Sequence, residues 1–139
     1  MAMTAALMMS GSVAQAQDVN IGRNNITLTS DLMTPETLWA MGRIGVAQAS
    51  PDGKKIVYQV GYYSVKENKG HQVLRVMDAE GKNDRLLTTS AKSEGDAAWL
   101  DNNTLAFLTG GQLWTMNADG TNRKQLTHSD IDIEGFRFS

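Results

Sequence analysis

Residues 74–88 read LRVMDAEGKNDRLLT, and residues 113–127 read LWTMNADGTNRKQLT. The two stretches align without a gap at an offset of 39 residues, and seven of the fifteen aligned positions are identical. Two further pairs, Asp78 with Asn117 and Glu80 with Asp119, keep the same chemical character. A repeat of this length indicates that one structural unit occurs twice in the chain.

Each copy of the repeat predicts a β-hairpin. We expect Asp78 and Asn117 to begin the turn through an Asx-type hydrogen bond, because short polar side chains readily bond their own backbone. Gly81 and its counterpart Gly120 are expected in the left-handed conformation that such a hairpin loop requires. Leu87 in the first copy and Leu126 in the second are then expected to return the chain to an apolar core.

The strands before each hairpin repeat as well. Residues 99–107 match the turn and strand of residues 50–58, and residues 135–139 begin a third copy. A period near 40 residues with four short strands per unit is typical of a β-propeller blade. We therefore predict an all-β chain, a partial β-propeller of two WD-like four-stranded blades and the start of a third, preceded by a short helix. Two blades cannot close a ring, so we expect a fragment of a longer protein.

The first residues have the pattern of a secretory signal. Residues 1–9 are apolar apart from Thr4, and Ala14-Gln15-Ala16 fits the cleavage site of such signals. We predict a signal peptide over residues 1–16, clipped at its start because its basic region is missing. The alternative is a short apolar helix of a cytosolic protein. The mature chain is expected to be exported, periplasmic or secreted, with no membrane anchor after cleavage.

One helix is predicted between the signal and the repeats. Residues 17–45 are assigned to a lead-in segment with a helix over residues 34–42, and residues 46–139 to the incomplete propeller. Thr34 is a good N-cap and Pro35 suits the first helical position.

Composition excludes several classes of function. The chain carries 13 basic and 15 acidic residues, a net charge of −2, which argues against nucleic acid or an anionic membrane as partner. The absence of cysteine excludes disulfides, thiolate metal sites and a cysteine nucleophile.

The sequence contains no catalytic motif. No serine follows a glycine by two residues, so a G-x-S-x-G nucleophile elbow is absent. The Gly-Lys pairs at residues 53–54 and 81–82 lack the earlier glycine of a P-loop. His71 and His128 are interpreted as surface side chains, solvated or hydrogen-bonded, because no metal-binding spacing surrounds them. We therefore predict no catalytic, cofactor-binding or metal-binding residue in this chain.

Other polar and aromatic groups have both a binding and a structural interpretation. The structural one is favoured for two sets, namely Asp78, Glu80 and Asp119 as turn caps instead of Ca²⁺ ligands, and Tyr62, Tyr63 and Trp114 as packing residues instead of a ligand-binding patch. Residues 62–70 are predicted to form a polar, solvated loop, with contact to a partner domain as the alternative.

Several short motifs together resemble a known family. The helix sequence TPETLW at residues 34–39 precedes SPDGK at residues 50–54, and both hairpins carry a Met-x-Ala-x-Gly turn. Over residues 31–139 the chain resembles the N-terminal propeller of the prolyl oligopeptidase family of serine peptidases, especially its bacterial dipeptidyl-peptidase and acylaminoacyl-peptidase branch. YYSVKENK at residues 62–69 resembles the extended first-blade loop of that branch. SPDGK alone is less specific, since TolB-type propellers use it too.

The resemblance implies a division of labour within a longer enzyme. Such peptidases join a propeller to a C-terminal α/β-hydrolase domain that carries the catalytic triad, and the propeller admits only short peptides. Some propellers also supply acidic residues for the substrate's amine, a role that the sequence assigns to none of Glu67, Glu80 and Glu94. We expect a non-catalytic propeller fragment of an exported serine exopeptidase, with that hydrolase domain and short peptides as partners. The alternatives are a periplasmic TolB-type propeller that binds proteins and an inactive truncated product.

Overall fold

The computed structural model describes residues 31–138 of the 139-residue chain. The predicted signal peptide, residues 1–16, lies outside the described residues, as do residues 17–30 of the predicted lead-in segment.

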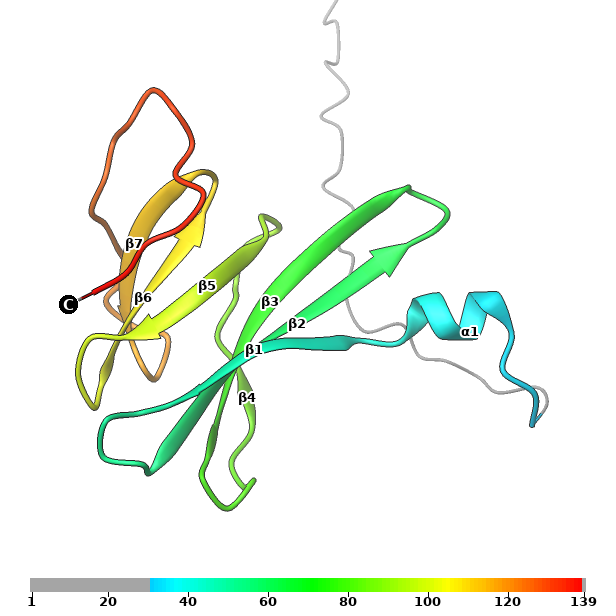
Figure 1. Cartoon of the computed structure of the whole chain (residues 1–139), viewed down its shortest axis with the longest axis horizontal. Helices are drawn as coiled ribbons and strands as arrows, with labels where there is room; N and C mark the ends of the chain where they lie inside the picture. Colours follow the sequence, from blue (N-terminus) through cyan, green and yellow to red (C-terminus); the bar gives the residue numbers. More distant parts are fainter. Residues whose placement is uncertain (1–30, 139) are drawn as a thin grey trace, which may run out of the picture.

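The described chain is mostly β, with two four-stranded antiparallel sheets and one short helix (Figure 1). Sheet 1 has the strand order β1-β2-β3-β4 and sheet 2 the order β5-β6-β7-β8, so each strand pairs with its neighbours in sequence. The two predicted four-stranded units are therefore confirmed, whereas residues 31–138 form no closed propeller. The elements are α1 (Pro35–Ala40), β1 (Arg43–Ala49), β2 (Lys55–Ser64), β3 (Lys69–Asp78), β4 (Arg85–Leu86), β5 (Glu94–Trp99), β6 (Thr104–Thr109), β7 (Gln112–Asn117) and β8 (Lys124–Gln125).

The sequence repeat corresponds to repeated hydrogen bonds. The amide of Leu87 donates to the carbonyl of Leu74 at 2.8 Å, and 39 residues later the amide of Leu126 donates to the carbonyl of Leu113 at the same distance. In both β-hairpin turns the glycine is left-handed, with φ of 78° in one copy and 87° in the other. The repeat therefore builds the same outer hairpin twice.

The side chains that hold the two turns differ from the expected Asx pattern. Neither Asp78 nor Asn117 accepts a bond from the backbone two residues on; the Asp78 carboxylate accepts the Asn83 amide at 2.6 Å. In the second turn Asp119 makes the local bond, accepting the backbone amide of Thr121 at 2.9 Å. The first turn is therefore held by a bond to its first residue, Asp78, and the second by a bond within the loop, at Asp119.

The apolar core lies between the two sheets. In β2 and β3 buried side chains are interspersed with half-buried or exposed ones, whereas residues 105–108 of β6 are all buried. The buried cluster consists of Val57, Leu74, Val76, Leu87, Ala97, Leu105, Phe107 and Met116, with Trp99 and Trp114 packed against it. Sheets 1 and 2 therefore share a single core.

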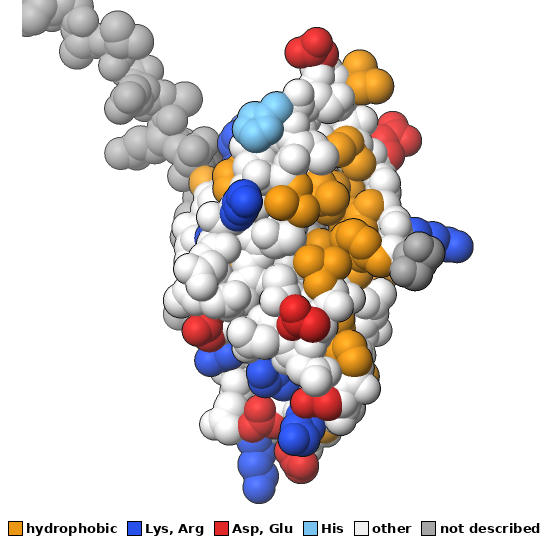
Figure 2. Space-filling model, turned by 90° about the vertical axis from the view of Figure 1, so that its left-hand side faces the viewer, with side chains coloured by type: hydrophobic (Ala, Val, Ile, Leu, Met, Phe, Trp, Pro, Cys, Tyr) orange, Lys and Arg blue, Asp and Glu red, His pale blue; other side chains and the backbone are white. Residues whose placement is uncertain are grey.

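The face of sheet 2 that does not pack against sheet 1 exposes apolar side chains. Figure 2 shows hydrophobic side chains gathered in a stripe on the side of the molecule that carries sheet 2 and the C-terminal segment. Large apolar side chains in this part of the chain are exposed, including Ile131 at 77%. Leu126 is 45% exposed, so the prediction that it returns to the core is wrong, whereas Leu87 at 1% confirms it for the first copy. Residues 132–138 form no strand, although the repeat predicts a third copy there; only the amide of Ile133 bonds to this sheet, at the carbonyl of Gly111.

Helix α1 begins as the sequence predicts but ends earlier. Thr34 is the N-cap, and its hydroxyl accepts the amide of Thr37 at 3.2 Å. The helix ends at Ala40 with Met41 extended, two residues before the predicted end. Gly42 follows the helix and does not end it. Its lack of a side chain is required by packing, because a Cβ at this position would lie 2.8 Å from side-chain atoms of Tyr62 and Val60. That close contact lets the chain turn directly into β1.

The predicted polar loop of residues 62–70 is wrong in extent. Strands β2 and β3 continue as a ladder as far as the pair Ser64 and Lys69, so only residues 65–68 form the turn. Each strand has ten residues, against six in β6 and β7. Residues 62–70 form this two-stranded extension of the sheet, which we call the arm. The arm projects beyond β1 and leaves much of its surface in water, which suits its polar side chains (Figure 1).

Candidate functional site

A pocket of about 460 Å³ lies where the arm leaves sheet 1, and we call it the arm pocket. It is bounded by the start of β1, by β2 and β3, and by the connection that enters β5. Its lining residues are Arg43, Ile44, Gly45, Gln59, Gly61, Tyr62, Gly70, His71, Gln72 and Ser93. Three of these are glycines, so backbone makes up part of the wall.

Gln59 is fixed in the pocket wall by its own amide. The register of β1 against β2 shifts between Ile44 and Ala47, a bulge that leaves the side chain of Gln59 next to Gly45. The side-chain oxygen of Gln59, Oε1, accepts a hydrogen bond from the backbone amide of Asp96 at 3.3 Å. Its Nε2 lies 3.6 Å from the Cβ position of Gly45. The oxygen is thus used by sheet 2, and the amide NH₂ lies on the β1 side of the pocket.

Arg43 is positioned by the helix and the arm together. Its guanidinium carbon lies 4.7 Å from the ring centre of Trp39 on α1, a cation–π contact. The Trp39 ring in turn packs against Tyr63 of the arm, with ring centres 5.3 Å apart. The chain of contacts links α1, the arm and the pocket.

His71 is buried, not a solvated surface side chain. Only 7% of the residue is exposed, and its Nε2 lies 3.3 Å from the Lys92 carbonyl oxygen. The prediction that His71 lies on the surface is therefore wrong, whereas the prediction that it is hydrogen-bonded is confirmed. The histidine links β3 to the connection that enters sheet 2. His128 is exposed, as expected.

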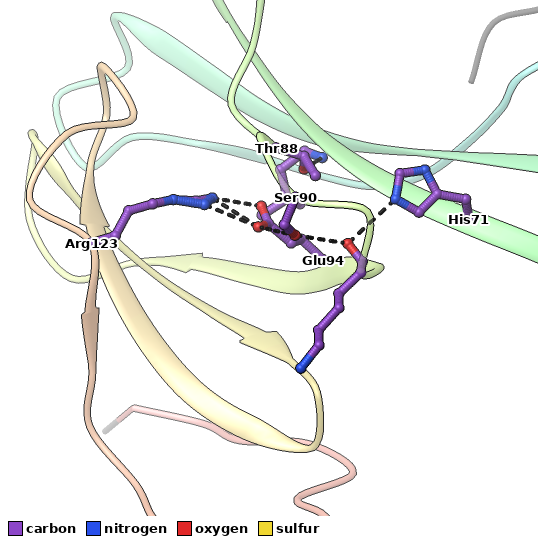
Figure 3. Close-up of polar contacts among 7 residues, drawn as sticks. His71, Thr88, Ser90, Glu94 and Arg123 are labelled. Atoms are coloured by element: carbon purple, nitrogen blue, oxygen red, sulfur yellow. Dashed lines mark hydrogen bonds and ion pairs between the residues drawn. The ribbon is translucent and has the colours of Figure 1, made fainter. Parts of the chain in front are cut away.

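A buried ion pair lies close to this connection (Figure 3). Glu94, only 1% exposed, accepts bonds from both terminal nitrogens of Arg123, the shortest at 2.7 Å, and one from the Ser90 hydroxyl at 3.3 Å. The Arg123 guanidinium also lies 5.1 Å from the ring centre of Phe107 in the core. Glu94 is therefore fully engaged inside the protein and does not present a carboxylate to a ligand.

The other candidates from the sequence are not brought together. Trp114 packs against the core in sheet 2, whereas Tyr63 packs on α1, so the aromatic patch does not form. Within residues 31–138, no group of three or more His, Asp or Glu side chains is arranged to hold a metal ion. No helix in that range is long and apolar enough to cross a membrane.

The sequence did not single out Asp96. This exposed residue lies in the bulge of β5, between Gly95 and Ala98, and has a φ of 50° although it is not glycine. Left-handed conformations of such residues are uncommon and often mark functional sites. The repeat could have pointed to the unusual backbone of Asp96, because glycine occurs at the related positions. The residue 39 positions later is Gly135, and the equivalent bulge of β1 contains Gly45.

A third polar cluster joins β2, β3 and the start of β4. Asp84 accepts two bonds from Arg75, the shorter at 2.6 Å, and the Tyr58 hydroxyl donates to it at 2.7 Å. These bonds, led by those from Arg75, hold the pKa of the Asp84 carboxyl below its usual 3.8. Burial, followed by the contact with Asp84, raises the pKa of Tyr58. The bonds of Asp84 to Arg75 and Tyr58 thus tie β2 and β3 to the start of β4.

The described residues thus form a chain built from two repeated four-stranded antiparallel sheets and one short helix. No family model matches it. It is 34% identical over 118 residues to dipeptidyl-peptidase 5 of Porphyromonas endodontalis, a match that covers 81% of this chain and 17% of the relative. It is also 34% identical over 83 residues to dipeptidyl-peptidase 5 of Porphyromonas gingivalis, covering 59% and 12%.

The chain is thus related to a segment of bacterial dipeptidyl-peptidase 5, a member of the prolyl oligopeptidase family, and the resemblance seen in the sequence is confirmed. It spans less than a fifth of the length of these two relatives.

Proposed function

We propose that the chain is the propeller segment of an exported serine exopeptidase, in which it serves as scaffold and gate for a C-terminal α/β-hydrolase domain. The similarity to two proteins named dipeptidyl-peptidase 5 carries the proposal. The small fraction of each relative that the chain matches supports its being part of a longer polypeptide.

The arrangement of the sheets supports the propeller. Sheets 1 and 2 have the same strand order, and they pack face to face around one core, as adjacent blades do. Residues 132–138 follow sheet 2 at the place where the repeat predicts the innermost strand of a third blade. Further blades would cover the hydrophobic stripe of sheet 2.

The polar chemistry of the described residues supports the proposed division of roles. Glu94 is tied to Arg123 and Asp84 to Arg75, so neither carboxylate is available as a general acid or base. In this proposal the Ser–His–Asp triad belongs to the hydrolase domain. The segment would bound a chamber that admits short peptides and excludes folded proteins, outside the cytoplasm.

Antibodies against this chain test the proposal in the cells that make it. On an immunoblot of periplasmic and cytoplasmic fractions, we expect a periplasmic polypeptide several times larger than 15.1 kDa. Capture of that polypeptide is expected to deplete hydrolysis of a dipeptidyl p-nitroanilide, whereas pre-immune antibodies leave the activity in solution. A band near 15 kDa alone, with undiminished activity in the supernatant, would contradict the proposal.

A further inference from the structure

We propose that the arm pocket binds a carboxylate group of a peptide. Its two residues with ionisable nitrogen are Arg43 and His71, and none of its ten lining residues is Asp or Glu. The other polar side chains in the lining belong to Gln59, Tyr62, Gln72 and Ser93, all of which can donate hydrogen bonds. A pocket with a cation, several donors and no acid favours an anionic ligand.

The donors are oriented by contacts outside the pocket. The Gln59 oxygen is held by the backbone amide of Asp96, which leaves the Gln59 NH₂ beside Gly45 in the pocket wall. A side-chain amide fixed in this way presents a donor, since its acceptor is already used. The donor therefore needs little reordering when a ligand binds.

Arg43 supplies the charge. Among the side chains that the structure describes, the ion pairs are Arg75 with Asp84 and Arg123 with Glu94, and Arg43 takes part in neither. Its stacking on Trp39 holds the face of the guanidinium and leaves the edge nitrogens available. A planar guanidinium can bind a carboxylate through two parallel hydrogen bonds.

The dimensions suit a small group and not a folded partner. The pocket of about 460 Å³ falls within the range of small-molecule sites, at the end that fits one or two residues. The choice of a peptide as ligand rests on the proposed function, whereas the choice of a carboxylate rests on the lining alone. The carboxylate could be the C-terminus of a short peptide or an acidic side chain.

Nuclear magnetic resonance titration of the full chain at low salt tests the inference without any hydrolysis. The four probes are N-acetyl-Ala-Ala with a free carboxylate, the same dipeptide as its amide, N-acetyl-Ala-Glu-amide and N-acetyl-Ala-Gln-amide. We expect the free acid to shift the amide signals of Gly45, Gly61 and Gly70, and the neutral dipeptides to bind roughly tenfold more weakly or not at all. The Glu and Gln probes show whether an acidic side chain serves as well as the C-terminus.

Two variants and a control locate the binding. Arg43→Gln is expected to weaken binding of the acid by roughly tenfold, and Gln59→Glu to abolish it by replacing a donor with a negative charge. Lys66→Gln removes a cation of the arm that does not line the pocket, and this variant should bind like the parent chain. The spectra of the variants report folding directly, so Gln59→Glu decides the matter if Arg43→Gln unfolds.

Equal binding of acid and neutral dipeptides, or binding that survives both variants, would overturn the inference. So would the absence of any shift in the folded chain. These outcomes are independent of the antibody experiment, since the chain could belong to a peptidase without binding carboxylates and could bind them without belonging to one.

Discussion

At the scale of single residues, the pair of Arg123 with Glu94 is the more deeply buried of the two ion pairs among the described side chains. The side chain of Glu94 is 2% exposed and that of Arg123 22%, so both charges are removed from most of the solvent. Their attraction and the additional bond from Ser90 offset this desolvation. The balance depends on both partners being present.

Replacing Arg123 by Ala is therefore expected to lower the free energy of unfolding by about 3–5 kcal/mol, because it leaves a buried carboxylate without its partner. Lys124→Ala, at the exposed neighbouring position, is the control and should change the free energy by about 0.5 kcal/mol or less. Urea denaturation at neutral pH measures both. Identical midpoints for the two variants would show that the ion pair does not stabilise the fold.

Asp84 gives a pH dependence whose sign follows from its lowered pKa. A carboxyl with a pKa below 3.8 in the folded chain stabilises the fold above that pH, and the contribution is lost as the pH falls through the folded pKa. Because 38% of the side chain is exposed, the pair with Arg75 contributes about 1 kcal/mol or less.

Acidification from about pH 5 to about pH 3 should therefore destabilise the parent chain more than an Asp84→Asn variant, by up to about 1 kcal/mol. Comparing the two chains isolates Asp84, since Asp52, Asp101 and Asp119 also have lowered pKa values and remain in both. Urea midpoints at the two pH values provide the measurement. Parallel losses in the two chains would contradict the assignment.

At the scale of elements, the repeat predicted most of the fold. An offset of 39 residues located both outer hairpins, because the left-handed glycines Gly81 and Gly120 impose the same turn. The arm was missed because a polar two-stranded ribbon has the composition of a loop, and only its register distinguishes the two.

The polar sites escaped the same reasoning because they lie where the copies differ. Glu94 corresponds to Ile133 at the repeat offset, and Arg123 corresponds to Asp84. Their meeting depends on how β5 and the turn before β8 pack across Phe107, which no local pattern encodes. The arm pocket likewise needs the β1 bulge to place Gln59.

The attachment of α1 to the arm gives a prediction for these elements. Trp39→Ala removes the contacts with Tyr63 and Arg43, which contribute about 0.5–1.5 kcal/mol and about 0.5–1 kcal/mol respectively. We expect the Leu38 amide, which bonds to the Thr34 carbonyl at 3.0 Å, to exchange its hydrogen faster, with amides of β6 unchanged.

Leu38→Ala is the matched control for this experiment. Leu38 is 48% exposed and Trp39 42%, yet Leu38 makes no ring contact of the kind that Trp39 makes. Hydrogen exchange in α1 should therefore respond much more to Trp39→Ala. Equal acceleration in both variants would mean that the helix is held by burial in general and not by the Trp39 contacts.

At the scale of the whole molecule, the shared core makes the two sheets one folding unit. Leu87 follows β4 and is 1% exposed among residues of both sheets, whereas its neighbour Leu86 is 51% exposed. The connection from sheet 1 to sheet 2 is thus anchored in the core before β5 begins. Loss of that anchor should affect both sheets at once.

Leu87→Ala is accordingly expected to lower the free energy of unfolding by about 2–5 kcal/mol, and Leu86→Ala by about 0.5 kcal/mol or less. Circular dichroism follows the strands of both sheets, and in a Trp39→Phe background the tryptophan fluorescence comes from Trp99 and Trp114 on the strands of sheet 2. If the sheets unfold as one unit, both signals move to the same lower urea concentration in Leu87→Ala. Two separate transitions, with sheet 2 unaffected by the substitution, would show that each sheet is stable by itself and that the shared core does not couple them.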